Sequence, residues 1–192
     1  MRFRISKRRL LYLAFGVAAF LIAYSAGAAV PLSDEEAKEV RKQFSEQIEG
    51  IDQNGIFLNN ARNALIMFIP GFGAGFGAIS WFATGSVFSA LASSTPILTG
   101  VPPLVILITP FGIMEVFTYG LMMSRSGMLI IRIVKDKPWR EGSRQPFLES
   151  SLMPAFIELG LAAAVLFAAA LIEWQMIEQF GGLDKSVIVE PV

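Results

Sequence analysis

The sequence predicts an all-α polytopic membrane protein with about five transmembrane helices, and three observations support this fold class. The chain has 192 residues, of which 54% are hydrophobic and only 17% are charged. Soluble domains average about 25% charged residues. The charges are gathered in blocks that long uncharged runs separate. Because about 20 apolar residues span the hydrocarbon as a helix, we expect residues 1–192 to form a single membrane domain.

The residue types that are missing exclude most catalytic chemistry. The chain has no Cys and no His, so it lacks thiol and imidazole nucleophiles, bases and metal ligands. Neither the GxxxxGK[ST] nor the GxGxxG phosphate-binding pattern occurs. The formal net charge is +0 and no basic aromatic platform for nucleic acid is present. We therefore expect no enzyme activity, no cofactor, no metal site and no nucleic-acid partner.

The charge blocks alternate in sign and predict the orientation in the membrane. Residues 1–9 carry a net charge of +5, residues 31–62 carry −3, residues 124–149 carry +3 and residues 173–192 carry −3. Basic loops of membrane proteins stay on the cytoplasmic side. The pattern therefore predicts an N-in/C-out topology, which requires an odd number of spans.

The first span is predicted over residues 10–30, which contain no charge. The basic block before it and the small residues at 26–28 are also typical of a cleaved signal peptide. The uncharged run is longer than the usual hydrophobic region of such a peptide. A retained transmembrane helix is therefore the favoured interpretation, with cleavage as the alternative, and both keep the basic end in the cytoplasm.

An amphipathic helix is predicted outside the membrane over residues 33–51. Ser33 and Glu36 have the spacing of a capping box. Apolar residues recur on one face at helical spacing: Ala37, Val40, Phe44, Ile48 and Ile51. We favour packing of this face on the protein's own helices over contact with the membrane surface.

The 52 uncharged residues from 63 to 114 are too many for a single crossing. With the acidic block outside and the next basic block inside, this region needs an odd number of spans. We assign spans to residues 58–78, 82–99 and 103–123. The alternative is four spans in total, if residues 58–99 form a broken helix pair that does not fully cross or if the first span is cleaved.

A basic cytoplasmic loop is predicted over residues 124–149. Apolar residues in its first half indicate that the preceding helix continues toward Pro138, which would end it. The basic side chains are either solvated topology determinants or contacts to anionic lipid headgroups, and the former is favoured. The last span is predicted over residues 152–173, and the acidic residues 174–192 follow outside.

Two carboxylates fall within the predicted spans and are the candidate functional groups. Glu115 follows Pro110 and Gly112, which free a backbone carbonyl and let another helix approach closely. Glu158 enters the last span from the cytoplasmic side. Each is about eight residues from the predicted inner boundary, so the two could lie at one depth and share a proton or hold a cation. The alternative, which we favour, is that each hydrogen-bonds a broken helix within the bundle.

A second polar set is predicted at the outer side of the membrane. Asn59, Asn60, Arg62 and Asn63 open the second span, and Glu173 closes the fifth. An ion pair between Arg62 and Glu173 would hold these two helix ends together. At a wet interface such a pair contributes only about 0–1 kcal/mol, so the expected role is structural.

Three short motifs follow one another along the chain, and their order is informative. They are Asn59-Asn60-Ala61-Arg62-Asn63-Ala64-Leu65, Pro110-Phe111-Gly112-Ile113-Met114-Glu115 and Ala169-Ala170-Leu171-Ile172-Glu173. In this order they resemble the stage II sporulation protein M family of integral membrane proteins, over about residues 55–175. The second segment is similar to the family's Pro-His-Gly-x-x-Glu, with Phe111 in place of the His. Glu115 and Glu173 correspond to family positions, and Glu158 does not.

The resemblance implies a multi-span scaffold that binds partners or shapes the membrane. We therefore expect a non-enzymatic subunit of a membrane protein complex in the plasma membrane of a bacterium or archaeon, with a role in membrane or envelope remodelling. The expected partners are the lipid bilayer and other membrane proteins or further copies of the chain. The alternative function is a small transporter or ion pathway that uses the buried carboxylates.

Overall fold

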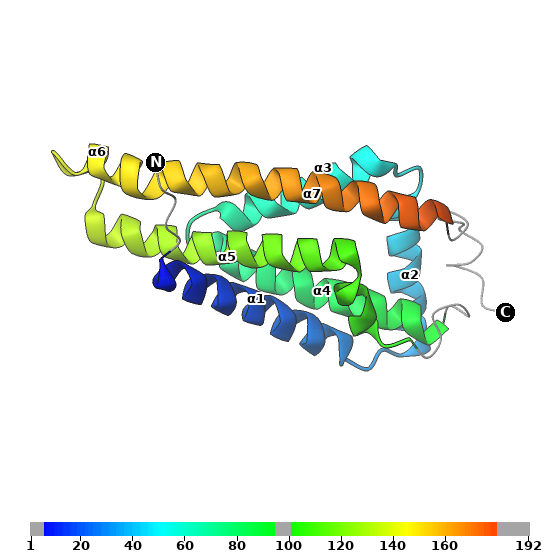
Figure 1. Ribbon diagram of the computed structural model, residues 1–192. Helices are drawn as coiled ribbons and strands as arrows, with labels where there is room; N and C mark the ends of the chain where they lie inside the picture. The colour runs from blue at the N-terminus through cyan, green and yellow to red at the C-terminus, as the bar shows by residue number, and fades with distance from the viewer. Residues whose placement is uncertain (1–5, 95–100, 180–192) are drawn as a thin grey trace.

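The computed structural model describes residues 6–94 and 101–179, and within them every regular element is helical. Six α-helices of fifteen residues or more and shorter helical segments are arranged as in Figure 1. In chain order they are α1 (Lys7–Ala28), α2 (Asp34–Ile48), α3 (Gln53–Phe68), α4 (Phe72–Ser94), the 3-10 helix η1 (Pro103–Ile108), α5 (Pro110–Asp136), α6 (Arg144–Phe147), the π-helix η2 (Leu148–Leu152) and α7 (Met153–Gln179). The all-α prediction is confirmed.

The long helices lie side by side and alternate in direction along the chain. Helices α1, α3, α4, α5 and α7 form the bundle, and α2 lies across one end of it (Figure 1). Helix α1 packs on α4 and α5, and α7 packs on α5 and α3. We call the two ends of the bundle the α2 end and the α6 end.

Within the described residues, 3 helices are long and apolar enough to cross a membrane. They are α1, α4 and the continuous helix formed by α6, η2 and α7, which spans Arg144–Gln179. Helix α3 has only 16 residues and is about 24 Å long. Helix α5 carries charged residues along its length. The chain is therefore a helical membrane protein, and α3 and α5 belong to the bundle without meeting the same criterion.

The break between the second and third predicted spans lies elsewhere in the structure. The predicted spans 58–78 and 82–99 place it near residue 80, which is in the middle of α4. The chain turns at Pro70 and Gly71, where Gly71 has a φ of 79°. The Ile69 carbonyl at this turn accepts a 2.9 Å hydrogen bond from the Gly73 N–H and a 2.6 Å hydrogen bond from the Ser126 hydroxyl of α5. The end of the predicted third span, residues 95–99, lies outside the described residues.

The fourth predicted span, 103–123, also differs from the structure. Its first residues form η1, and α5 begins at Pro110 after the cap residue Thr109. Helix α5 then continues to Asp136, where Lys137 adopts a left-handed conformation and Pro138 follows. The predicted stop at Pro138 is confirmed. The predicted tail 174–192 is described only as far as Gln179.

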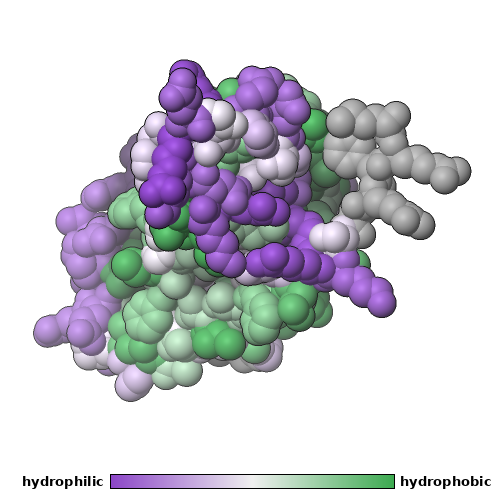
Figure 2. All heavy atoms as spheres, turned by 90° about the vertical axis from the view of Figure 1, so that its left-hand side faces the viewer, coloured by the Kyte–Doolittle hydropathy of each residue, from purple (hydrophilic) through white to green (hydrophobic). Residues whose placement is uncertain are grey.

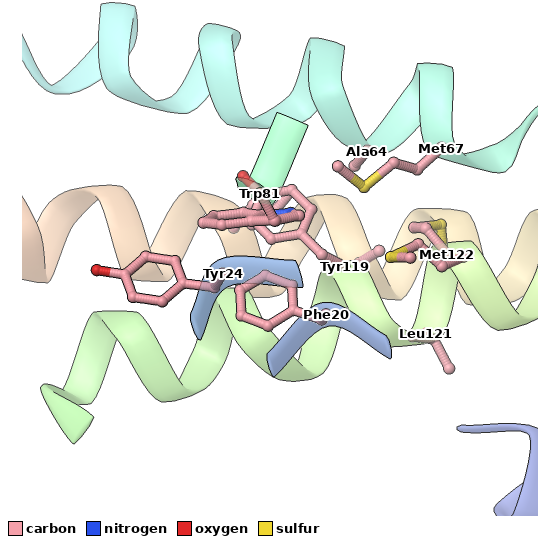
Figure 3. Close-up of a cluster of buried hydrophobic side chains, with 11 residues drawn as sticks. Phe20, Tyr24, Ala64, Met67, Trp81, Tyr119, Leu121 and Met122 are labelled. Carbon is pink, nitrogen blue, oxygen red and sulfur yellow. The ribbon is translucent and has the colours of Figure 1, made fainter. Parts of the chain in front are cut away.

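Aromatic side chains from three helices form the centre of the core (Figure 3). Trp81 of α4 lies between Phe20 of α1, at 4.2 Å between ring centroids, and Tyr119 of α5, at 4.9 Å. Phe20 and Tyr24 are 0% exposed. Tyr24 also donates a 2.7 Å hydrogen bond to the Pro103 carbonyl of η1. The N-terminal helix therefore supplies part of the core of the bundle.

Glycines allow α1 to approach its neighbours closely. A Cβ at Gly16 would collide with the backbone carbonyl of Gly120 in α5, and a Cβ at Gly27 would collide with the backbone of Phe82 in α4. Lipid tails are as apolar as helix surfaces, so the hydrophobic effect does not drive helices together within a membrane. Small residues let the backbones approach closely, and the resulting van der Waals contacts stabilise the packing.

Helix α2 begins at the predicted capping box. The Ser33 hydroxyl accepts from the Glu36 backbone N–H, and the Glu36 carboxylate accepts from the Ser33 backbone N–H at 2.9 Å. Ala37 and Ser45 are buried, and α2 contacts α4. The charged residues on its other side are exposed: Asp34, Glu35, Lys38, Glu39, Lys42 and Glu46.

Candidate functional site

A group of three charged side chains joins α1, α5 and α7 toward the α6 end of the bundle. The Glu158 carboxylate of α7 accepts hydrogen bonds from Arg9 Nε at 2.9 Å and Arg9 Nη2 at 2.6 Å. Arg125 of α5 donates to the same carboxylate through Nε at 2.9 Å and through Nη2. Both guanidinium groups are therefore bidentate, which is the strong geometry for this pair. We call these residues the ionic cluster.

The ionic cluster is largely removed from solvent. The side chains of Arg9, Arg125 and Glu158 are 11%, 7% and 21% exposed. Arg9 also donates to the Ser124 hydroxyl at 2.8 Å, and that hydroxyl donates to the Leu121 carbonyl at 2.8 Å. Charges in a membrane-embedded bundle are costly unless they are paired and hydrogen-bonded. Here one carboxylate pairs with two cations.

Local structure positions Arg9 for this contact. Ser6 caps α1, and its hydroxyl accepts from the Arg9 backbone N–H at 3.1 Å. Two turns further on, the close approach of Gly16 to Gly120 brings α1 against α5. The Arg9 side chain can therefore reach across α5 to α7.

A second polar group lies toward the α2 end and joins α3, α5 and α7. The Asn60 amide of α3 donates a 2.5 Å hydrogen bond to the Glu115 carboxylate of α5. Glu173 of α7 lies close enough for its charge to interact with that of Glu115, and Tyr119 is close to both. We call Asn60, Glu115 and Glu173 the Glu115 cluster.

The start of α5 holds Glu115 in place. The Thr109 hydroxyl accepts from the Gly112 backbone N–H at 3.1 Å and donates to the Ile106 carbonyl at 2.6 Å. Pro110 occupies the first turn, where a missing N–H costs nothing. A Cβ at Gly112 would collide with the Ile106 carbonyl, so only glycine allows η1 to fold back on α5.

The two clusters occupy different levels of the bundle. Glu115 and Arg125 are ten residues apart on α5, which corresponds to about 15 Å along the helix. Glu158 and Glu173 are fifteen residues apart on α7, or about 22 Å. The aromatic core lies near Tyr119 between them, and the Trp81 indole N–H there is buried with no hydrogen-bond partner among the described residues.

Glu115 and Glu158 therefore do not lie at one depth, and the pairing that the sequence left open as the less favoured interpretation is not formed. The prediction placed the inner end of the helix that carries Glu115 at residue 123. That helix continues to Asp136, so Glu115 lies nearer the α2 end than the prediction assumed. Glu158 pairs with two arginines, and Glu115 meets Asn60 and Glu173.

Arg62 and Glu173 both lie in the described part of the chain, and the ion pair predicted between them is not formed. Arg62 is exposed and donates to Asn59 of its own helix at 3.4 Å. Asn59 is exposed and Asn63 is partly buried, and the buried asparagine of this segment is Asn60.

Two residues of the clusters, Arg9 and Arg125, were not among the predicted site residues, and Asn60 was predicted only as a member of the outer polar set. Asn60 belongs to a stripe of buried α3 residues at helical spacing: Ile56, Asn60, Ala64 and Met67. That periodicity separates it from its neighbours and was the available signal. Arg9 and Arg125 were interpreted as topology determinants, although Glu158 in an apolar segment requires a cation to neutralise it.

The comparisons with known proteins give one match. A family model described as Stage II sporulation protein M matches residues 10–174. The matched region begins one residue after Arg9 and ends one residue after Glu173, so it includes all residues of the two clusters except Arg9. No curated protein and no solved structure matches the chain.

Proposed function

The chain belongs to the Stage II sporulation protein M family, and we propose that it acts as a non-enzymatic scaffold or subunit of a membrane protein complex. The observation that carries this proposal is the ionic cluster. One carboxylate of α7 is held by arginines of α1 and α5 in bidentate geometry. The buried charges thus serve to fix three helices to one another, as a rigid frame requires.

The frame presents an exposed charged surface at its α2 end. Helix α2 lies across the bundle (Figure 1), buries Ala37 and Ser45 against it, and exposes Glu35, Lys38, Glu39 and Lys42. Mixed charges on a fixed helix are suited to recognition of a partner by electrostatic complementarity. We propose that a partner protein binds there, outside the plasma membrane of a prokaryote, in membrane or envelope remodelling.

The scaffold proposal is tested by purifying the protein from its native membrane in mild detergent and identifying what accompanies it. We expect a partner in constant stoichiometry that is reduced or lost when Lys38 and Lys42 are both changed to Glu. A matched double change at Arg8 and Lys7, which are exposed at the opposite end, should leave the partner bound. A protein that purifies alone and monomeric from its native membrane would contradict the proposal.

We also propose five spans in an N-in/C-out topology. The alternating directions of α1, α3, α4, α5 and α7 support this (Figure 1). The chain has no Cys, so single cysteines can be labelled in intact cells with an impermeant maleimide. We expect labelling at positions 39 and 101 from outside, and at positions 69 and 141 only after permeabilisation. A cysteine at position 69 that resists labelling from both sides would favour the four-span alternative.

A small transporter or ion pathway is the second candidate function. The convergence of Glu115 and Glu173 with Asn60 inside the bundle supports it. Two carboxylates in a low-dielectric setting can share a proton or hold a cation. Proton or cation flux into liposomes that falls on changing Glu115 to Gln would support a pathway. Flux that is absent, or unchanged in that variant, would contradict it.

A further inference from the structure

The connection between α5 and α6 forms a hairpin that projects past the rest of the bundle. The hairpin comprises residues 130–148 and extends beyond the start of α1 and α4 at the α6 end (Figure 1). Asp136 lies eleven residues beyond Arg125 on α5, about 16 Å past the ionic cluster. Helix α1 begins at Lys7, close to that cluster, whereas the helix that contains α7 continues to Arg144 in the hairpin. We infer from the start of α1 that the hairpin reaches the level of lipid headgroups.

The hairpin is strongly basic. It carries five cations, Arg132, Lys135, Lys137, Arg140 and Arg144, and two acids, Asp136 and Glu141. Arg132 forms an exposed pair with Asp136 at 3.5 Å. In the part of the chain that the structure describes, the other four cations form no ion pair. Their positive charge is therefore available to an anionic partner.

Exposed apolar side chains accompany these cations. Trp139 is 68% exposed and Val134 is 61% exposed. Tryptophan is enriched where an apolar ring meets the polar headgroup layer. Figure 2 shows this end of the molecule, where hydrophilic residues gather over the upper part, on the side of α6. A surface that combines cations with apolar side chains is suited to bind an anionic phospholipid, which is itself both charged and apolar.

Positive φ angles and backbone hydrogen bonds form the turn of the hairpin. Lys137 has a φ of 44° and Gly142 a φ of 78°. The Arg140 N–H donates to the Lys137 carbonyl at 2.9 Å, and the Ser143 N–H donates to the Arg140 carbonyl at 3.1 Å. Phe147 is buried and anchors α6. The basic side chains are thus presented from a defined turn.

We propose that the α5–α6 hairpin is a binding surface for anionic phospholipids. Lys135, Lys137 and Arg140 contact the phosphate groups, and Trp139 lies in the headgroup layer beside them. The favoured expectation from the sequence, that these cations serve only to set topology, predicts no preference among lipids. The proposal is independent of the scaffold function, because it concerns a different surface and needs no partner protein.

The test uses the full chain reconstituted in phosphatidylcholine vesicles that contain a minor share of phosphatidylglycerol. Brominated acyl chains, which quench tryptophan, are placed either on the phosphatidylglycerol or on the phosphatidylcholine. The contribution of Trp139 is the quenching that is lost on changing Trp139 to Phe. We expect stronger quenching, per lipid present, by the brominated phosphatidylglycerol, and a preference that falls with added salt.

A charge variant and a matched control separate specific binding from a general effect. Each basic residue near the membrane surface raises the preference for anionic lipid over phosphatidylcholine about five-fold. Changing Lys135, Lys137 and Arg140 together to Gln should therefore lower the preference at least about ten-fold. Changing Lys38 and Lys42 of α2 to Gln should leave it unaltered. Helical circular dichroism and gel filtration check that each variant is folded.

Three outcomes would overturn the proposal. The first is equal quenching by the two brominated lipids. The second is a preference that survives in the folded triple variant. The third is a preference that the α2 control variant removes equally. A protein partner that is lost in the triple variant, with no lipid preference in the unaltered chain, would assign this surface to protein recognition instead.

Discussion

Arg9 and Glu158 are 149 positions apart in the sequence, yet Arg9 Nη2 lies 2.6 Å from Glu158 Oε2. This contact joins the N-terminal helix of the bundle to its last helix. Arg125 shares the same carboxylate, so α1, α5 and α7 meet at a single anion. Removing the carboxylate and removing one cation should therefore have unequal effects.

Changing Glu158 to Ala should lower the free energy of unfolding by about 3 kcal/mol, because two poorly exposed cations are left without a counter-charge. Changing Arg9 to Ala should cost less, about 1–2 kcal/mol, since Arg125 still neutralises Glu158. The measurement is unfolding of the purified protein in mild detergent. Changing the exposed neighbour Arg8 to Ala is the control and should stay within about 0.5 kcal/mol. Equal effects at Arg9 and Glu158 would contradict the shared-anion geometry.

Glu115 should tolerate Gln but not Ala. Gln keeps an acceptor for the Asn60 amide and removes the ionisable carboxyl group. Ala leaves the buried amide of Asn60 without its acceptor, which costs about 1–3 kcal/mol. The same unfolding measurement compares the two variants, with Asn59 to Ala on the exposed side of α3 as the control. If the Gln variant were as unstable as the Ala variant, the hydrogen bond from Asn60 would not account for the stability of this cluster.

Gly16 should not tolerate Ala. The added Cβ would meet the backbone of Gly120 and lie 3.1 Å from Ser124 Cβ, so the two helices would have to separate. We expect a loss of about 1–3 kcal/mol. Gly160 is the matched control, because it also lies within a helix but has nothing within 4 Å of an added Cβ. Its change to Ala should be neutral or stabilising by up to about 1 kcal/mol. A neutral Gly16 variant would rule out the close contact of α1 with α5.

The capping box of α2 should make its first turn sensitive to acid. The Ser33 backbone N–H and hydroxyl donate to Glu36 and hold the pKa of that carboxyl below its ordinary value of 4.5. Because the pKa is lower in the folded state, ionised Glu36 stabilises α2 above pH 4.5. That contribution is lost as the pH falls through the lower, folded-state pKa.

The pKa of Glu36 can be measured by a 13C NMR titration of the carboxyl carbons, with the Glu36 signal identified by its loss in the Gln variant. Changing Ser33 to Ala removes the hydroxyl donor and should raise the midpoint toward 4.5. A midpoint at or above 4.5 in the unaltered chain would show that the capping box is not formed.

Much of the architecture could be predicted because local patterns determine it. Uncharged runs and charge blocks predicted an all-α membrane protein, and the three motif segments predicted a family that the match over residues 10–174 shows. Ser33 with Glu36 predicted the start of α2, and Pro138 predicted the stop after α5. In each case the relevant residues are within a few positions of the feature that they determine.

The helix boundaries inside the long uncharged region could not be predicted in this way. Several glycines and prolines there are all compatible with a break, and the turn at Pro70 is selected by a tertiary contact from Ser126. The partners of Glu115 and Glu158 depend on the same boundaries. With the inner end of α5 placed at residue 123 instead of Asp136, the two carboxylates could be taken to lie at one depth, although pairing them was not the favoured interpretation.

The contact between Arg9 and Glu158 also has a consequence for biogenesis. Translation adds about 5–20 residues per second, so Glu158 is made about 7–30 s after Arg9. During that interval the first helix is already synthesised, and its arginine has no counter-charge from the last helix. Chains that end before α7 can already pack α1 on α4 and α5, but their Arg9 and Arg125 are left without this counter-charge. The last helix therefore completes the neutralisation of a bundle whose first helices are already in place.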